Sequence, residues 1–336
     1  MKILNWNIEW MNHWFSGNRT PQWGSNALDA ASAQTVAQKV AELIKQIDPD
    51  VLCVQEGPSA LEEMQLFIDR FLSADGAPQY EALMGRDGGA QKLYVLTKVG
   101  GAVESMDYAR DAATVALDEA WQADVDGDLV LKPYEFTRMP MVVDLVPKEL
   151  EPLRVVVLHS KSKYVHQGKK LWEDPKQRHL FIVEAMRARR RISAEGFRVR
   201  SYLDSLIQAN PHARIVVTGD WNDGPGTDFF ERQYLTHNVA DIILGSTFYP
   251  DLIFHHPILQ HVPSAERFTA RFDDFIDDKQ DRPLLLDHFA ISPALRDAVA
   301  GAGIAHQEYE RQLGGPGAAR TQRASDHRPI WLELNE

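Results

Sequence analysis

The stretch "ARIVVTGDWNDGPG" (residues 213–226) begins with residues typical of a buried strand and ends with glycines and a proline, which neither a strand nor a helix continues. Its β-branched residues favour a strand with both faces covered. Asp220 and Asn222 then place oxygen-bearing side chains at the strand end, and the following glycines let the chain turn away. A single Asp or Asn after a strand is usually a turn former or a helix cap. Only the rest of the chain decides whether this end is also a functional site.

Polar side chains recur at the ends of the other predicted strands. In chain order they are Asn7, Glu56, His159, Asp220 with Asn222, Asp287, and Asp326 with His327. In a layered α/β fold these ends lie along one edge of the sheets, so their side chains can converge on one crevice while the strands stay rigid. Each of these residues alone has an ordinary structural explanation, and only the whole set indicates a functional site.

The chemistry of this set favours a hard divalent cation. Oxygen ligands from Asp, Glu and Asn suit Mg²⁺, and Mn²⁺ is its natural substitute. No cysteine or histidine cluster has the spacing of a structural zinc site. Carboxylates around a divalent ion, together with amides and imidazoles, match the needs of phosphoester hydrolysis. The ion neutralises phosphate charge, a carboxylate orients water, and a His–Asp pair handles protons.

The order of predicted elements indicates two sheets packed face to face with helices outside. Hydrophobic periodicity predicts helices over 31–48, 59–73 and 176–209. It predicts strands over 1–10, 51–56, 79–84, 92–98, 114–118, 140–147, 153–159, 213–219, 285–292 and 329–334. We find no linker and no internal repeat, so we expect one domain over residues 1–336.

The segment "DVDGDLVLKPYE" (124–135) allows two interpretations. Acidic residues stand at positions 1, 3, 5 and 12 of a calcium-binding loop, but Leu129 occupies the position that should be glycine. The residues that follow read as a strand and not as a helix. A hairpin with Asp-Gly at its tip explains the same residues and is the preferred interpretation. Calcium binding stays open at this point.

Composition predicts a soluble, cytoplasmic protein. The 336 residues are 44% hydrophobic and include one cysteine, Cys53, which excludes an internal disulfide framework and fits a reducing compartment. The first strand already starts at Lys2, which leaves no room for a signal peptide. No apolar run approaches 18 residues, so we expect no membrane insertion. A disulfide-linked partner is not expected either.

Charge is distributed unevenly along the chain. The formal net charge is −12, whereas broad nucleic-acid-binding faces are usually basic. Residues 159–200 hold twelve Lys or Arg and four Asp or Glu, a net +8, so the remainder carries −20. The run "RARRR" (187–191) fits a solvated helix face. The alternative is a patch that steers phosphates toward the site.

Taken together, the motifs resemble the endonuclease/exonuclease/phosphatase superfamily. They occur in the family's order as "NWNIE", "QE", "RMP", "HSKSK", "GDWND", "LLLDH" and "SDHRP", and they span nearly the whole chain. This group includes deoxyribonuclease I, abasic-site nucleases, sphingomyelinases and inositol polyphosphate 5-phosphatases. The resemblance implies a four-layered α/β/β/α sandwich of two packed mixed β-sheets with outer helices.

The resemblance also implies roles for individual residues. Glu56 resembles the main metal-binding glutamate, with Asn7 and Asp326 in the same metal shell. Asp220 resembles the carboxylate that positions or deprotonates the attacking water, and Asn222 would hold that water and contact a phosphate oxygen.

Further roles concern protons and phosphate. His327, oriented by Asp287, resembles the family's His–Asp pair, and Arg138 resembles a phosphate-contacting arginine. His159 resembles a second histidine that relatives pair with a glutamate, and Gln91 is the nearest position here. Because Gln91 cannot stabilise an imidazolium as a carboxylate does, we expect His159 to be a neutral donor. Lys161 and Lys163 follow His159 and either hold phosphates or lie in a solvated loop.

The resulting prediction is a Mg²⁺-dependent phosphoester hydrolase that uses in-line attack of water on phosphorus. A nuclease or phosphodiesterase acting on DNA or RNA is favoured by the basic segment and by the aromatic residues around the first strand (Trp6, Trp10, Trp14, Phe15 and Trp23). The alternatives are a phosphatase for a nucleotide, inositol phosphate or lipid headgroup, and a binding module without catalysis.

Overall fold

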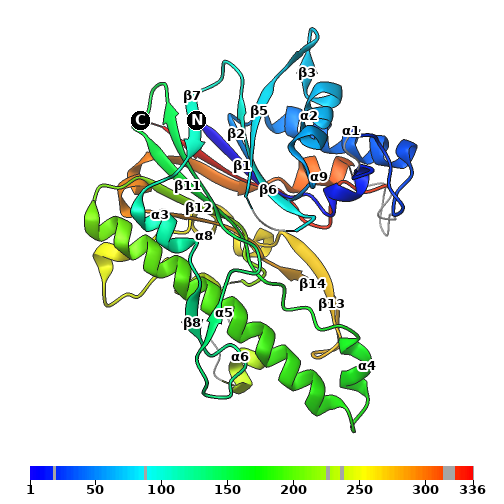
Figure 1. Cartoon of the computed structure of the whole chain (residues 1–336), viewed down its shortest axis with the longest axis vertical. Helices are drawn as coiled ribbons and strands as arrows, with labels where there is room; N and C mark the ends of the chain where they lie inside the picture. Colours follow the sequence, from blue (N-terminus) through cyan, green and yellow to red (C-terminus); the bar gives the residue numbers. More distant parts are fainter. Residues whose placement is uncertain (18–19, 87–88, 225–227, 235–237, 313–321, 336) are drawn as a thin grey trace.

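Two β-sheets packed face to face form the centre of this computed structural model, which describes residues 1–17, 20–86, 89–224, 228–234, 238–312 and 322–335 (Figure 1). The first sheet has the order β16 (Val299–Ile304), β17 (Ile330–Leu334), β1 (Lys2–Asn7), β2 (Val51–Gly57), β6 (Lys92–Lys98) and β5 (Tyr80–Met84). The second has the order β15 (Asp287–Ile291), β12 (Ile215–Asp220), β11 (Leu153–His159), β10 (Met141–Pro147) and β7 (Val103–Tyr108). Both sheets are mixed, because β1–β2 and β11–β12 are parallel pairs among antiparallel ones.

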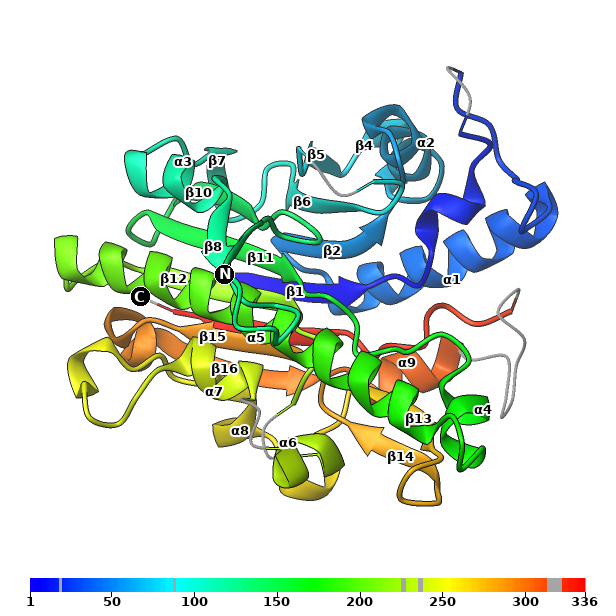
Figure 2. The same ribbon diagram turned by 60° about the horizontal axis from the view of Figure 1, so that its bottom comes forward.

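Helices cover the outer face of each sheet (Figure 2). The first sheet is covered by α1 (Ala30–Ile47), α2 (Leu61–Phe71) and α9 (His306–Gln312), and the second by α3 (Ala112–Leu117), α5 (Arg178–Ala209) and α7 (Val239–Leu244). The remaining helices are α4 (Gly168–Glu173), α6 (Phe229–Tyr234), α8 (Pro257–His261) and the short 3-10 turns η1 (Met11–Trp14), η2 (Pro250–Leu252), η3 (Ser264–Glu266) and η4 (Pro293–Ala298). No described helix combines the length and the apolar character that crossing a bilayer demands.

Strand residues alternate between two buried layers, which explains their continuous hydrophobic runs. In β12, Val216 faces the other sheet, whereas Ile215 and Val217 face the α5 layer. In β1, Ile3 lies between the sheets and Leu4 faces the α1 layer. Because successive strand side chains point to opposite faces, a strand covered on both sides needs apolar residues at every position. The predicted four-layered α/β/β/α sandwich is therefore confirmed.

One predicted strand is wrong. Residues 114–118 were expected to be extended, but Ala112–Leu117 form α3. Asp111 caps this helix, since its carboxylate accepts hydrogen bonds from the amide of Thr114 at 3.1 Å and from its hydroxyl at 2.8 Å. Leu117 packs into the cluster around α5. The cap and this packing outweigh the strand preference of the β-branched Thr114 and Val115.

The segment 124–135 forms the predicted hairpin. Strands β8 (Trp121–Ala123) and β9 (Lys132–Tyr134) pair across it. The Asp124 carboxylate accepts hydrogen bonds from the amides of Gly127, Asp128 and Leu129. Lys132 forms ion pairs with Asp126 and Asp128. Amides and an ammonium group thus bind these acidic side chains, and these contacts explain the conformation of the loop without a calcium ion.

Two further hairpins complete the molecule. Strands β3 (Ser73–Ala74) and β4 (Ala77–Pro78) form one, and β13 (Ala270–Asp274) and β14 (Lys279–Leu284) form the other. Periodicity did not predict β13 and β14, since "ARFDD" and "KQDRPL" are mostly exposed and polar. The hairpin projects below α5 in Figure 2. Its base adjoins the start of β15, where the hydroxyl oxygen of Thr269 accepts hydrogen bonds from the amides of Leu286 and Asp287.

Candidate active site

The polar strand ends converge as the sequence pattern predicts. In the second sheet, His159, Asp220 and Asp287 are direct neighbours in register across β11, β12 and β15. The amide nitrogen Nδ2 of Asn7, from the first sheet, lies 2.9 Å from Oδ2 of Asp220 and 3.5 Å from Oε1 of Glu56. One asparagine therefore joins the strand ends of both sheets.

Gly219 allows the end of β12 to approach β11 closely. Its φ is +139°, and a Cβ atom at this position would lie 1.9 Å from the carbonyl oxygen of Leu158. Any other residue would push the strands apart just before Asp220. Asn222 then adopts φ +52°, a conformation that asparagine tolerates better than most residues. Its Nδ2 donates to the carbonyl of Ser160 at 3.0 Å. This local backbone aims Asp220 and Asn222 into the site.

His327 and Asp287 form a buried pair beside Asp220. The Nδ1 atom of His327 lies 2.7 Å from Oδ2 of Asp287. Burial alone would lower the pKa of His327, but Asp287 and Asp220 raise that pKa well above its usual value. Burial raises the pKa of Asp220, while the charge of His327 opposes the rise. Ligand atoms of these three residues all lie within 4.8 Å of one another, so the ring bonds to Asp287 and lies close to Asp220.

A second group of oxygen atoms surrounds Glu56. Its Oε2 accepts hydrogen bonds from the amide of Trp10 at 2.9 Å and from Nε2 of Gln91 at 2.6 Å. Burial raises the pKa of Glu56, and the half-buried Asp326 contributes to the rise. The Oδ1 atom of Asn7 is buried and has no partner among the described residues. Glu56, Asn7 and Asp326 therefore offer carboxylate and amide oxygens, the donors that suit a hard divalent cation.

These two groups differ in what they can hold. Among the described residues, Asp220, Asp287 and His327 form a group whose ligand atoms are close enough together to hold a cation. However, Nδ1 of His327 already bonds to Asp287, and the positive imidazolium neutralises the carboxylates. Each group keeps one buried oxygen that has no partner among the described residues, Oδ1 of Asn7 and Oδ1 of Asp287. The Glu56 group differs in that it offers oxygen donors alone, the donor set that a hard divalent cation prefers.

His159 lies between Asp220 and Glu56. Its Nε2 is 3.6 Å from Oδ2 of Asp220 and 3.8 Å from Oε1 of Glu56, and its Nδ1 is buried without a partner in the described chain. Burial, Arg138 and His327 hold the pKa of His159 well below its usual value. This lowered pKa favours the neutral form of the ring. The expected neighbour Gln91 donates to Glu56 instead of His159.

Arg138 and Lys161 lie on two loops, and Glu195 forms hydrogen bonds with both loops. The carboxylate of Glu195, 2% exposed on α5, accepts hydrogen bonds from the amides of Thr137 at 2.9 Å and Lys161 at 3.0 Å. Nη1 of Arg138 donates to the carbonyl of Ser160 at 3.2 Å. Sequence reasoning missed Glu195, because an acid within a basic helix gives no sign that it points inward.

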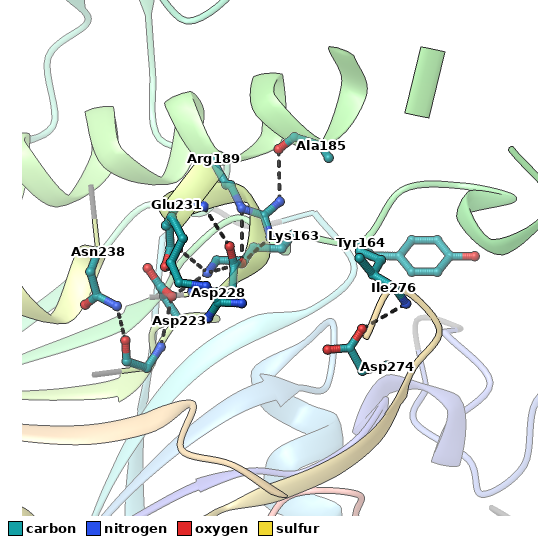
Figure 3. A network of polar contacts seen from close by, with 12 residues as sticks. Lys163, Tyr164, Ala185, Arg189, Asp223, Asp228, Glu231, Asn238, Asp274 and Ile276 are labelled. Atoms are coloured by element: carbon teal, nitrogen blue, oxygen red, sulfur yellow. Dashed lines mark hydrogen bonds and ion pairs between the residues drawn. The ribbon is translucent and has the colours of Figure 1, made fainter. Parts of the chain in front are cut away.

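The sequence suggested that Lys163 holds phosphate or lies in a solvated loop, but its side chain lies among carboxylates (Figure 3). Its ammonium contacts Asp223, lies 2.8 Å from Glu231 and 3.3 Å from Asp228, and Arg189 also pairs with Asp228. Burial would lower the pKa of Lys163, but these carboxylates raise it. Lys163 thus fastens the turn after Asn222 to α6 and α5. It does not lie in a solvated loop, and its charge is already balanced by three carboxylates.

The arginines of "RARRR" are largely engaged within the protein. Arg187 forms an ion pair with Asp126 at 3.2 Å, and Arg190 donates to the carbonyl of the same residue at 3.2 Å. Arg189 pairs with Asp228. Much of this charge thus holds α5 to the β8–β9 hairpin and to the Lys163 network. The geometry favours a structural role over a free phosphate-steering patch.

Comparison with known proteins agrees with this geometry. The sequence profile of the "Endonuclease/Exonuclease/phosphatase family" matches residues 4–327. The chain belongs to the endonuclease/exonuclease/phosphatase family. As a member of this family it is a metal-dependent enzyme that hydrolyses phosphoesters. The family resemblance inferred from the motifs is thereby confirmed.

Solved structures share the family fold at low sequence identity. One is the 3'-5' exonuclease NExo from Neisseria meningitidis, with 15% identity, a TM-score of 0.51 and 100% of both chains covered. Another is truncated Caenorhabditis elegans TDP2, with 15% identity, a TM-score of 0.52, and coverage of 100% of this chain and 97% of that one. A family protein from Bacteroides thetaiotaomicron has 16% identity, a TM-score of 0.51 and coverage of 99% and 94%. No curated protein matches the sequence.

Proposed function

We propose that this family member is a Mg²⁺-dependent nuclease or phosphodiesterase that hydrolyses nucleic-acid phosphoesters by in-line attack of water. The observation that carries the proposal is the position of Asn7, which bridges Glu56 and Asp220 and keeps one buried amide oxygen without a partner. This arrangement supports a cation site directly beside a carboxylate that can handle water. The two functions needed for phosphoester hydrolysis thus lie next to each other.

The proposed cation ligands are Glu56, Asn7 and Asp326. When bound there, Mg²⁺, or Mn²⁺ in its place, would neutralise negative charge on the phosphate. The chain's own residues carry the remaining work. Asp220 orients the attacking water and receives its proton, because its carboxylate is 2% exposed and lies at the centre of the polar group. Asn222 holds this water and contacts a phosphate oxygen.

The two histidines have different proposed roles. His327, kept protonated by Asp287, places positive charge against the phosphate and supplies a proton to the leaving oxygen. His159 is neutral and donates a hydrogen bond to a phosphate oxygen. Arg138 and Lys161 are the proposed phosphate contacts at the site's edge. We assign Lys163 to support of the turn after Asn222, because its ammonium is surrounded by carboxylates.

The proposed substrate class rests on one similar structure and on the charge of the chain. The NExo structure from Neisseria is described as a 3' phosphatase bound to a product DNA hairpin, at 16% identity and a TM-score of 0.51. We take a nucleic acid with an accessible end as the first candidate. A small-molecule phosphatase is the second candidate, because the net charge is −12 and many α5 arginines are already paired. Such a surface attracts a long polyanion less strongly.

A substrate panel tests the proposal. The purified protein is incubated with Mg²⁺ or Mn²⁺ and single-stranded DNA, double-stranded DNA, RNA, and bis- and mono-(p-nitrophenyl) phosphate. EDTA and the Asp220→Asn variant are the controls. Polynucleotide cleavage that both controls abolish, and that falls steeply with added salt, is the expected result. Activity restricted to small monoesters would replace the nuclease by a phosphatase. Activity that persists in EDTA would contradict the proposed cation.

A further inference from the structure

One aromatic residue of the N-terminal group differs from the rest. Trp6, Trp14 and Phe15 are at most 2% exposed and belong to the core between β1 and α1. Trp23 packs on Phe15 with a centroid distance of 4.9 Å. Trp10 is 42% exposed. Most of these rings therefore build the core, and Trp10 needs a separate explanation.

The backbone at Trp10 is strained and tied to the candidate cation site. Trp10 has φ +52°, a conformation that is a genuine outlier for a bulky side chain. Its amide donates to Oε2 of Glu56 at 2.9 Å. Glu56 itself has φ +58°. Strained residues persist where the surrounding structure holds them, and they cluster at active sites. The strained Trp10 backbone thus contacts the proposed cation ligand Glu56 directly.

Trp10 stacks on a second ring and borders a pocket. The rings of Trp10 and His13 lie 4.9 Å apart with an interplanar angle of 21°. We call the pocket beside them the Trp10 pocket; its lining includes the apolar residues Leu28 and Val36 and the charged residue Arg323. Nη2 of Arg323 lies 3.9 Å from Oδ2 of Asp326. The pocket therefore adjoins two proposed cation ligands, Glu56 through Trp10 and Asp326 through Arg323.

The charges at the rim indicate what kind of group fits. Arg323 forms a two-bond ion pair with Glu9, at 2.9 and 2.8 Å, so its charge is already balanced. Because it is already paired, Arg323 is a weak partner for an additional phosphate group. Aromatic and aliphatic lining residues beside polar ones suit a neutral planar ring that carries polar edges. A nucleobase has both properties.

We propose that the Trp10 pocket binds the nucleobase adjacent to the scissile phosphate by stacking on Trp10. This inference rests on the proposed nuclease function and specifies its substrate: a nucleotide whose base is unstacked from its neighbours. Trp10 is then a specificity-determining residue. Its contribution appears in the preference for a substrate with a base over the same substrate without one.

Matched small substrates test this assignment. The substrates are p-nitrophenyl phosphodiesters of thymidine, linked through the 5′ or the 3′ oxygen, and the corresponding esters of abasic 1,2-dideoxyribose. Each pair has the same leaving group, so the ratio of kcat/KM values reports the base alone. The variants are Trp10→Ala, Trp10→Phe and, as a control, Phe248→Ala. Phe248 is 88% exposed and lies in the segment between α7 and η2, outside the Trp10 pocket.

In the wild type, one linkage should show a preference for the base of about tenfold or more. Trp10→Ala should bring this ratio close to one, Trp10→Phe should retain most of it, and Phe248→Ala should leave it unchanged. An unchanged ratio in Trp10→Ala, or no preference in the wild type, would overturn the proposal. Because Trp10→Ala keeps the backbone amide that contacts Glu56, an equal loss on both substrates would indicate a purely structural role.

A binding measurement separates failure of this inference from failure of the proposed function. If no phosphodiester is hydrolysed, the nuclease proposal fails, and calorimetric titration with thymidine monophosphate in EDTA then decides about the pocket. Binding that is stronger than that of the abasic phosphate, and that Trp10→Ala removes, would support the pocket. Equal binding of the two compounds would reject it.

Discussion

Asp220 and His327 are buried against each other, so the charge of each depends on the other. His327 is 5% exposed and Asp220 is 2% exposed. Asp287 holds Nδ1 of His327 at 2.7 Å, which directs the other ring nitrogen away from Asp287. Removing one member of such a group leaves a partner's charge without compensation. These positions therefore combine a proposed catalytic role with an energetic cost to the fold.

The first prediction concerns turnover. Asp220→Asn and His327→Ala should each lower kcat by about 100-fold or more, the usual scale for a positioned acid–base group. The control is Asp69→Asn on the exposed face of α2, which should have wild-type kcat. Turnover is measured on the best substrate of the panel, with circular dichroism to confirm folding. Wild-type turnover in either active-site variant would remove that residue from the mechanism.

The second prediction concerns the cation. Glu56→Gln should shift the Mg²⁺ titration of activity to about tenfold or higher concentrations, because the variant loses the carboxylate at the centre of the proposed ligand set. Glu62→Gln, at an exposed position of α2, is the matched control. The same shift should appear when Mn²⁺ binding is followed by calorimetry. Superimposable titrations of the wild type and Glu56→Gln would place the cation elsewhere.

The sequence predicted that these residues lie close together, because each of them stands at the end of a strand. Strand register then brings His159, Asp220 and Asp287 side by side without further information. Spacing could not separate Lys161 from Lys163, since their different environments depend on α6, which is remote in sequence. Gln91 also contacts a different partner from the expected one. Long-range contacts of this kind leave no periodic signal.

Among the elements, the loop after β11 and the turn that begins after β12 are held by several side-chain contacts. Asp223 accepts a hydrogen bond from the amide of Val239 at 2.8 Å, and its carbonyl lies 2.6 Å from Nε2 of His288. Lys163 joins the same residue from the β11 loop. Contacts from three elements thus fix the turn that carries Asn222. The long predicted helix and the strands were found because their periodicity extends over many residues, whereas α3 depends on a cap and was missed.

The third prediction compares two lysines on one loop. Lys163→Met should lower the free energy of unfolding by about 3–5 kcal/mol, because it leaves buried carboxylates without a counter-charge. Lys161→Met should cost less than about 1 kcal/mol, since within the described part of the chain its ammonium has only a long contact with the carbonyl of Ser162 at 3.5 Å. In contrast, Lys161→Met should raise KM if Lys161 contacts phosphate. Chemical denaturation and steady-state kinetics measure both effects. Equal losses of stability would contradict the different environments of the two lysines.

For the molecule as a whole, the four layers depend on contacts between distant parts of the chain. The central strand β1 pairs with β2 on one side and with β17 on the other. The side chain of Trp6 donates to the carbonyl of His327 at 2.8 Å across 321 residues. Ser325 donates to the carbonyl of Asn7 at 2.6 Å. These bonds join the two segments that carry the proposed cation ligands Asn7 and Asp326.

The fourth prediction concerns acid stability of the fold. Burial alone would raise the pKa of Asp228, but Lys163 and Arg189 lower this pKa to about 2, from a usual value of 3.8. A lowered acid pKa means that the stabilisation is present above the unfolded value and is lost as pH falls through the folded value. Asp228 should thus contribute up to about 2 kcal/mol at neutral pH, lost between about pH 4 and pH 2.

Urea unfolding at pH 5 and pH 3 measures this contribution. Asp228→Asn should lose less stability than the wild type over this interval, because it has no proton to bind. Asp69→Asn should behave like the wild type. If the wild type and Asp228→Asn lose equal stability between the two pH values, the ion pairs around Lys163 do not contribute to the pH dependence.

The pairing of β1 with β17 also has a consequence for biosynthesis. A ribosome adds about 5–20 residues per second, so Trp6 is made roughly 15–65 s before its partner His327. During that interval β1 lacks one neighbour and the site lacks Asp326 and the His327–Asp287 pair. A polypeptide that ends before Asp326 therefore lacks part of the proposed site. We expect the proposed activity only after the ribosome has passed His327.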